Sequence, residues 1–199
     1  MSELPKNRII GLTGMSGAGK STACEAFKKR GFAVIDCDEI ARNTASDSGF
    51  LAELGERFPE RLVGADGRLD RMLTAKYIFN DSEKRRLYER IIFPYIIYGI
   101  MRAIRAAGKD VLLDAPTLFE AGLDIICGGI VSVTAPKDLC AKRIGTRDGI
   151  SEERALERLS AQHSAEYYRE RSDYSLENDG TAVELFDNTN KIIDKLTEH

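Results

Sequence analysis

The sequence predicts an α/β fold in which a five-stranded parallel sheet is flanked by helices. Short apolar runs of strand length alternate with helix-forming stretches over most of the chain, which is typical of β-α units. A glycine-rich loop, residues 14–22, separates the first apolar run from the first helix-forming stretch. With 199 residues, 43% of them hydrophobic, the chain can bury a core, and its length favours one domain with an inserted region.

The first strand is expected at residues 8–13, which read RIIGLT, a short apolar run typical of a buried parallel strand. The helix that follows the glycine loop is expected at residues 21–30 and is closed by Gly31. Strand, glycine loop and helix therefore follow one another in the order that points the N-terminus of the helix, with its partial positive charge, at a bound anion.

The second strand, residues 32–35, is followed at once by Asp36 and Asp38 and then by a helical stretch at residues 39–42. An acid at this place can cap the helix. The carboxyl ends of parallel strands are also where α/β proteins place their chemistry. Because the glycine loop is next to it, we assign Asp38 a functional role.

Residues 48–108 show a helical pattern with no obvious strand, too long for a single crossover, and we interpret them as an inserted acceptor-binding region. Helices are expected at residues 68–79 and after Asp81, which is placed as an N-cap. Pro94 removes a backbone donor and clashes with the preceding turn, so the second helix is expected to break or kink at residues 92–95.

Two further buried strands are expected at residues 110–116 and 129–135. The first of them carries Asp114 near its end, where enzymes with a phosphate loop place the acid that supports magnesium. Pro136 marks the start of the next helix.

That helix carries Arg143 and Arg147 one turn apart on one face, and Ser151 caps the helix after it. Two arginines can belong to a solvated face, but beside a triphosphate they can neutralise charge on the transferred phosphoryl group. The charged segment of about residues 143–164 is therefore predicted to be a lid.

A short fifth strand at residues 173–178 and a capping box from Thr181 to Glu184 precede the last helix. The whole chain, residues 1–199, is predicted to be a single domain. Its core comprises residues 7–47 and 109–199, interrupted by the inserted region.

The loop from Gly14 to Thr22 matches the phosphate-binding pattern G-x-x-x-x-G-K-[ST]. Glycines let its backbone N–H groups turn inward and approach phosphate oxygens closely. Lys20 can then reach the β- and γ-phosphates of ATP, and the Ser21 hydroxyl can bind Mg²⁺, with Asp114 as a second candidate for the metal. The loop residues expected at the nucleotide are Gly14, Gly17, Ala18, Gly19, Lys20, Ser21 and Thr22.

The net charge of −3, from 29 basic and 32 acidic residues, does not call for a nucleic-acid partner. No apolar run approaches the roughly 20 residues that cross a bilayer, and the polar start at residues 2–7 lacks a signal-peptide core. The protein is expected in the cytoplasm, away from membranes, as a monomer or weak oligomer.

Cysteine and histidine chemistry is not indicated. The four cysteines form no C-x-x-C pair, which argues against a zinc or redox site. The two histidines are the terminal His199 and His163, which lies inside a predicted helix, so a histidine-based catalytic or metal site is not expected.

An ordered series of motifs resembles the dephospho-CoA kinase family, which has a P-loop kinase fold similar to nucleoside monophosphate kinases, over nearly the whole chain. The matching segments are Gly11-Leu12-Thr13-Gly14, Asp36-Cys37-Asp38, Ile40-Ala41-Arg42, Gly67-Arg68-Leu69-Asp70-Arg71, residues 114–120 (DAPTLFE), Arg143 with Arg147, Arg158 with Gln162, and Ser172-Asp173 followed by Asn178 and Gly180. This series is far more specific than the phosphate loop alone.

The resemblance implies transfer of the γ-phosphoryl group of ATP to the ribose 3′-hydroxyl of dephospho-CoA, the last step of coenzyme A synthesis. The implied catalytic residues are Lys20, Asp38 and Arg143; Arg147, Asn178 and Gly180 would meet the nucleotide; and Thr13, Asp38, Arg42, Arg71 and Glu120 would meet the acceptor. Phe93 stands where the family usually has a histidine, and Thr117 replaces a leucine, so these two departures leave the acceptor open.

Two other functions are considered. One is a P-loop kinase that acts on a different small alcohol or nucleotide. The other is a nucleotide-dependent switch, for which Asn190-Lys191 is the best support, although a guanine-reading N-K-x-D motif needs an acid where Ile193 stands.

Overall fold

A computed structural model describes residues 7–198, so the predictions for the polar start of the chain and for His199 lie outside the described residues. The chain divides into two compact units, one made of residues 1–36 and 107–199 and the other of Cys37–Ala106. The second unit begins ahead of the insertion expected at residues 48–108, because the helix after the second strand groups with it. No helix within residues 7–198 has the length and apolar character needed to cross a bilayer.

The first unit is built on one five-stranded sheet in the order β2-β3-β1-β4-β5, and every pairing is parallel, as the sequence predicts. Its strands are β1 (Ile9–Gly14), β2 (Ala33–Asp36), β3 (Val111–Asp114), β4 (Gly129–Thr134) and β5 (Tyr174–Glu177). The three central strands, β3, β1 and β4, are short, apolar and mostly buried, as expected of a sheet covered by helices.

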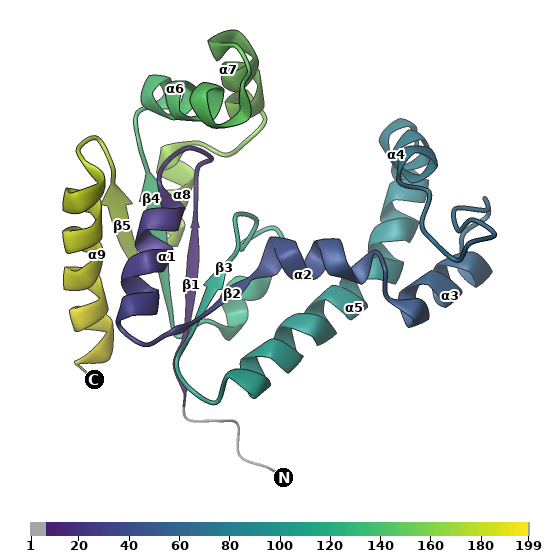
Figure 1. Cartoon of the computed structure of the whole chain (residues 1–199), viewed down its shortest axis with the longest axis horizontal. Helices are drawn as coiled ribbons and strands as arrows, with labels where there is room; N and C mark the ends of the chain where they lie inside the picture. Colours follow the sequence, from purple (N-terminus) through teal and green to yellow (C-terminus); the bar gives the residue numbers. More distant parts are fainter. Residues whose placement is uncertain (1–6, 199) are drawn as a thin grey trace. The chain divides into compact units, whose positions relative to one another are not determined.

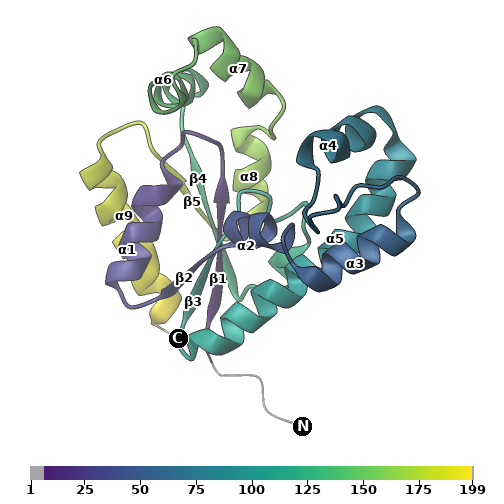
Figure 2. The ribbon, with the colours of Figure 1, turned by 45° about the vertical axis from the view of Figure 1, so that its right-hand side comes forward.

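The helices of the first unit cover the sheet and extend beyond its carboxyl end. They are α1 (Lys20–Lys29), the short 3₁₀ helix η1 (Leu123–Ile126), α6 (Lys137–Asp148), α7 (Glu152–Ser160), α8 (Ala165–Arg171) and α9 (Ala182–Thr197). Figures 1 and 2 show α1 and α9 side by side on one face of the sheet, α8 on the other, and the α6–α7 hairpin above the carboxyl ends of the strands.

Burial of apolar side chains from the strands and from α1, α6 and α9 forms the core of this unit. Phe27 of α1 is fully buried and meets Phe32 edge to face at 5.1 Å between ring centroids. Met15, next to the first glycine of the loop, is also buried in this cluster. The core thus reaches directly under the phosphate loop.

The second unit is entirely helical apart from an isolated bridge between Val63 and Leu69. Its helices are α2 (Cys37–Thr44), α3 (Ser48–Arg57), α4 (Arg71–Asn80) and α5 (Ser82–Ala107). Each of the last three starts beside an aspartate that accepts backbone N–H bonds, namely Asp47, Asp70 and Asp81. The three helices start at these aspartates because each carboxylate accepts hydrogen bonds from backbone N–H groups that the helix itself leaves unpaired.

The expected break at Pro94 is not found, because α5 continues through this residue. Proline costs a helix one internal hydrogen bond. Burial of Ile91, Ile92, Ile100 and Ile104 on either side of it keeps both halves of the helix in one packed element. Tertiary burial therefore outweighs the local preference here.

Phe50 is the best place to test the separate core of the second unit. It is fully buried and contacts Tyr88 and Tyr95 at 5.9 Å. Phe50→Ala is expected to lower the free energy of unfolding by about 3–5 kcal/mol, because burial is lost and a cavity remains. Phe79→Ala is the matched control: Phe79 is 81% exposed, and the change is expected to stay within about 0.5 kcal/mol. Urea unfolding followed by circular dichroism measures both, and equal losses would contradict the assigned core.

Candidate active site

The phosphate loop joins β1 to α1 and has the backbone that its glycines permit. Gly14, Gly17 and Gly19 all have positive φ, at 130°, 76° and 106°. A Cβ on Gly14 would lie 2.0 Å from the carbonyl oxygen of Val133 in the neighbouring strand β4. The backbone N–H of Met15 donates to the same oxygen at 3.2 Å. The loop is therefore pressed onto β4 more closely than any side chain allows.

Lys20 is the first residue of α1, whose start has no side-chain cap. The Lys20 ammonium donates to the carbonyl oxygens of Gly14 at 2.9 Å and Met15 at 3.2 Å. The uncapped N–H groups, the partial positive charge of the helix start and this ammonium form a site that favours an anion. The order of strand, glycine loop and helix is the one predicted from the sequence.

Asp114 ends β3, the strand beside β1, and pairs in register with Leu12. The thiol of Cys24 donates to one of its carboxylate oxygens at 3.3 Å. Burial, followed by the charge of Asp114, raises the pKa of the Cys24 thiol well above its usual range, so it stays protonated as a donor. The Asp114 carboxylate is thus held at the carboxyl edge of the sheet, one strand from the phosphate loop.

Asp114 and the exposed Ser21 supply the hard oxygen donors that Mg²⁺ prefers. Within residues 7–198 no cluster of three or more His, Cys, Asp or Glu side chains could hold a metal by itself. This donor set fits Mg²⁺ rather than a fully protein-caged metal, because Mg²⁺ usually keeps one or two protein ligands and takes the rest from phosphates and water.

Asn178, just after β5, is buried against the phosphate loop. Its side-chain amide donates to the carbonyl oxygen of Ala18 at 2.7 Å, and its backbone N–H continues the pairing with Thr134 at 2.8 Å. Gly180, which the sequence places with it, lies beside the carboxylate of Glu184 in the capping box that starts α9. The predicted capping box is therefore confirmed, and Asn178 supports the loop.

Arg143 and Arg147 have different surroundings in this structure. The guanidinium of Arg143 reaches the carbonyl oxygens of Gly17 at 3.4 Å and Asn178 at 3.3 Å, so it lies at the loop. Arg147 instead makes two bonds to Asp148, at 2.7 and 3.2 Å. Asp148 also accepts from Arg158 at 2.8 Å, and its hydrogen bond with Arg147 holds its pKa below the usual range.

Other residues of the site were not assigned roles from the sequence. Gln162 donates to the Ser16 hydroxyl at 2.7 Å and accepts from the Ser16 backbone N–H at 3.0 Å. His163 was predicted inside a helix, but it lies between α7 and α8 and contacts Glu120 at 3.0 Å. The helical prediction was wrong because the turn after Ser160 ends α7, and nothing in the local pattern marks that end.

The remaining candidates of the first unit differ in exposure. Thr13 is fully buried, and its hydroxyl donates to the carbonyl oxygen of Pro116 at 3.1 Å. Thr117 and Glu120 are exposed in the turn after β3. The hydrogen of the Thr13 hydroxyl is therefore used within the protein.

In the second unit, Asp38 and Arg42 are exposed on α2, and Arg71 is the exposed first residue of α4. Burial raises the pKa of Tyr88, and the positive charge of Arg71 partly opposes this, so the two side chains are neighbours.

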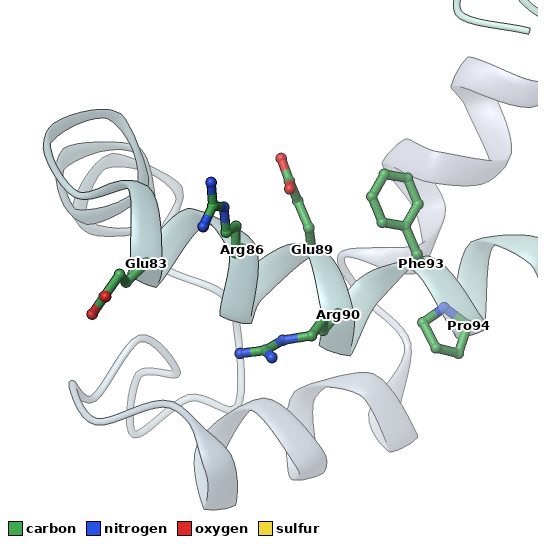
Figure 3. Close-up of a pocket in the computed structure, with 6 residues that line it drawn as sticks. All are labelled: Glu83, Arg86, Glu89, Arg90, Phe93 and Pro94. Carbon is green, nitrogen blue, oxygen red and sulfur yellow. The ribbon is translucent and has the colours of Figure 1, made fainter. Parts of the chain in front are cut away.

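Phe93 is 43% exposed on α5 and lines a hollow of about 730 Å³ with the five residues drawn beside it in Figure 3. Four of those five are charged, namely Glu83, Arg86, Glu89 and Arg90, and the fifth is Pro94. Phe93 therefore lies in a polar hollow rather than in the apolar core of its unit.

The fold and the site define a P-loop kinase. A phosphate loop joins the first strand of a parallel sheet to the first helix, whose first residue is a lysine. An acid ends the neighbouring strand, and a helical hairpin carries arginines. The sequence profile of the dephospho-CoA kinase family matches residues 8–184. The chain belongs to the dephospho-CoA kinase family.

Individual relatives agree with this assignment. The chain is 39% identical over 181 residues to the dephospho-CoA kinase of Clostridium tetani, covering 88% of this chain and 80% of the relative. It is 31% identical over 196 residues to that of Oryza sativa, covering 96% and 85%. The crystal structure of TT1252 from Thermus thermophilus superposes with a TM-score of 0.82 at 32% identity, covering 97% of this chain and 99% of the other.

The contact between Gly14 and β4 can be tested by adding one methyl group. Gly14→Ala is expected to weaken ATP binding at least about tenfold, because the new Cβ would displace the loop from Val133. Gly31→Ala is the matched control, since Gly31 also has positive φ but has no atom within 4 Å of the added Cβ. The control is expected to lose about 1–2 kcal/mol of stability and keep its ATP affinity. Calorimetric titration and urea unfolding measure the two effects, and equal ATP affinities would contradict the tight contact.

Proposed function

We propose that this protein transfers the γ-phosphoryl group of ATP to the 3′-hydroxyl of the ribose of dephospho-CoA, giving coenzyme A and ADP. The observation that carries the proposal is the phosphate loop held against β4 with Lys20 at its end. Family membership supports the acceptor, because the matched relatives bear the name dephospho-CoA kinase. The P-loop kinase class itself uses ATP.

The loop amides and the start of α1 would bind the phosphates of ATP. Lys20 would leave the loop carbonyls that it now contacts and bridge the β- and γ-phosphate oxygens, whose negative charge attracts it more strongly than neutral carbonyls do. Ser21 and Asp114 would hold Mg²⁺. When bound, this ion neutralises negative charge on the phosphates.

Asp38 would accept the proton of the acceptor hydroxyl as it attacks, in the role of general base. Arg143 already lies at the loop and would stabilise charge on the transferred group. Arg147 would join it only by leaving Asp148, so we infer that the α6–α7 hairpin closes when both substrates are bound. Closure would also exclude water from the reaction.

Arg42, Arg71 and Glu120 are the proposed contacts to the acceptor. Phe93 and Thr117 are both exposed, so their departures from the family pattern change a surface rather than the core. We further propose a cytoplasmic enzyme that needs Mg²⁺ and works as a monomer or weak oligomer.

The switch has no support in the fold. Asn190 and Lys191 lie inside α9, where their side chains bond Phe186 and Asn188 of the same helix. A guanine-reading motif would need these side chains free for a base. The family assignment likewise favours dephospho-CoA over another alcohol as acceptor.

Asp38 and Asp36 make a matched pair for testing the general base. Asp38→Asn is expected to lower kcat about 100-fold or more on dephospho-CoA, because proton removal loses its acceptor, while ATP affinity stays unchanged. Asp36→Asn is expected to keep most of the activity. ADP release with ATP, Mg²⁺ and dephospho-CoA measures both variants against the wild type.

Two results of this assay would count against the proposal. A loss confined to Asp36→Asn would move the base to the neighbouring carboxylate. Wild-type enzyme that phosphorylates other nucleosides or pantetheine compounds but leaves dephospho-CoA untouched would overturn the acceptor.

A further inference from the structure

The connection between α7 and α8, residues 161–164, touches two loops at the carboxyl end of the sheet. Its Gln162 is tied to Ser16 of the phosphate loop by two hydrogen bonds, at 2.7 and 3.0 Å. The next residue, His163, is tied to Glu120 in the turn after β3 at 3.0 Å. This short segment therefore joins the end of the α6–α7 hairpin to the phosphate loop and to the turn after β3, on the nucleotide side and the acceptor side of the proposed site.

The ring of His163 is fixed in orientation by stacking. It lies on the ring of Tyr167 with 3.7 Å between centroids and 14° between the planes. Tyr167 is in turn held by Phe119, edge to face at 5.9 Å, and by the Arg171 guanidinium, 4.6 Å from its centroid. Because the imidazole is clamped in this way, its Nε2 points at one carboxylate oxygen of Glu120.

A hydrogen on Nε2 would donate to this carboxylate oxygen, because a carboxylate can only accept. Within residues 7–198, His163 is the single side chain that pairs with the Glu120 carboxylate. Tyr168, from the same helix as Tyr167, is the other titratable group close by: burial and then the charge of Glu120 raise its pKa to about 12, so it stays neutral. One oxygen of Glu120 is thus used by His163 and the other is left for a ligand.

We propose that His163 is a positioning residue for the acceptor: it holds Glu120 in one orientation and couples that carboxylate to closure of the α6–α7 hairpin. The inference rests on the proposed function, in which Glu120 contacts dephospho-CoA. An exposed glutamate samples several rotamers, and fixing one of them removes an entropy cost from acceptor binding. Gln162, one residue earlier, performs the equivalent coupling on the nucleotide side.

Because Gln162 contacts the phosphate loop and His163 contacts Glu120, changes at these adjacent positions are expected to have different kinetic effects. His163→Phe keeps a flat ring for the stack on Tyr167 and removes the donor. It is expected to raise the KM for dephospho-CoA about fivefold to tenfold, with little change in the KM for ATP. Gln162→Ala is expected to raise the KM for ATP more than that for dephospho-CoA, because it frees the phosphate loop instead.

His163→Gln keeps an N–H donor near the same place and loses the stack, so it is expected to recover most of the acceptor affinity. Glu120→Ala is expected to raise the KM for dephospho-CoA at least as much as His163→Phe. The double variant is expected to match Glu120→Ala alone, because each change removes the same interaction.

The experiment measures kcat and both KM values for the wild type and these variants, with thermal unfolding to show that each is folded. An unchanged KM for dephospho-CoA in His163→Phe would overturn the positioning role. Effects that simply add in the double variant would do the same. In either case turnover by the wild type would leave the proposed function intact. Because 45% of the His163 side chain is exposed, the variants are expected to fold; should His163→Phe fail to fold, Glu120→Ala and His163→Gln decide the question. A wild type that neither binds nor phosphorylates dephospho-CoA would instead remove both proposals.

Discussion

The close approach of Gly14 to the carbonyl oxygen of Val133 is the constraint on which the rest of the site depends. It places the last residue of β1 against β4 so closely that only glycine is possible, and it directs the loop back over the sheet. Lys20 is then the first residue of α1, and its ammonium donates to the loop carbonyls. A phosphate site follows from backbone geometry, with few side chains needed.

Two carbonyl oxygens of the phosphate loop accept hydrogen bonds from distant parts of the chain. Asn178 bonds Ala18 from the end of β5, and Arg143 bonds Gly17 from α6. These two bonds hold the loop from the end of β5 and from α6. In the proposed reaction Arg143 would combine this support of the loop with stabilisation of charge on the transferred phosphoryl group.

The contacts that hold the α6–α7 hairpin are different at its two ends. At one end Arg147 pairs with Asp148 at the protein surface, an exposed interaction that is weak and easily exchanged. At the other end Gln162 and His163 make directed contacts to two loops of the sheet edge. A hairpin anchored at one end and loosely paired at the other suits a lid that closes on substrates.

The sequence by itself determined the parallel sheet, the phosphate loop and the helix caps at Asp81, Ser151 and Thr181. These depend on local features: apolar runs, glycines at fixed spacing, and a capping residue at the helix start. It also indicated Asp114 correctly at the end of its strand. Only the tertiary structure decided that α5 runs through Pro94 and that His163 meets Glu120. Both depend on packing between segments far apart in the chain, and no periodicity or spacing encodes which residues will face each other across such contacts.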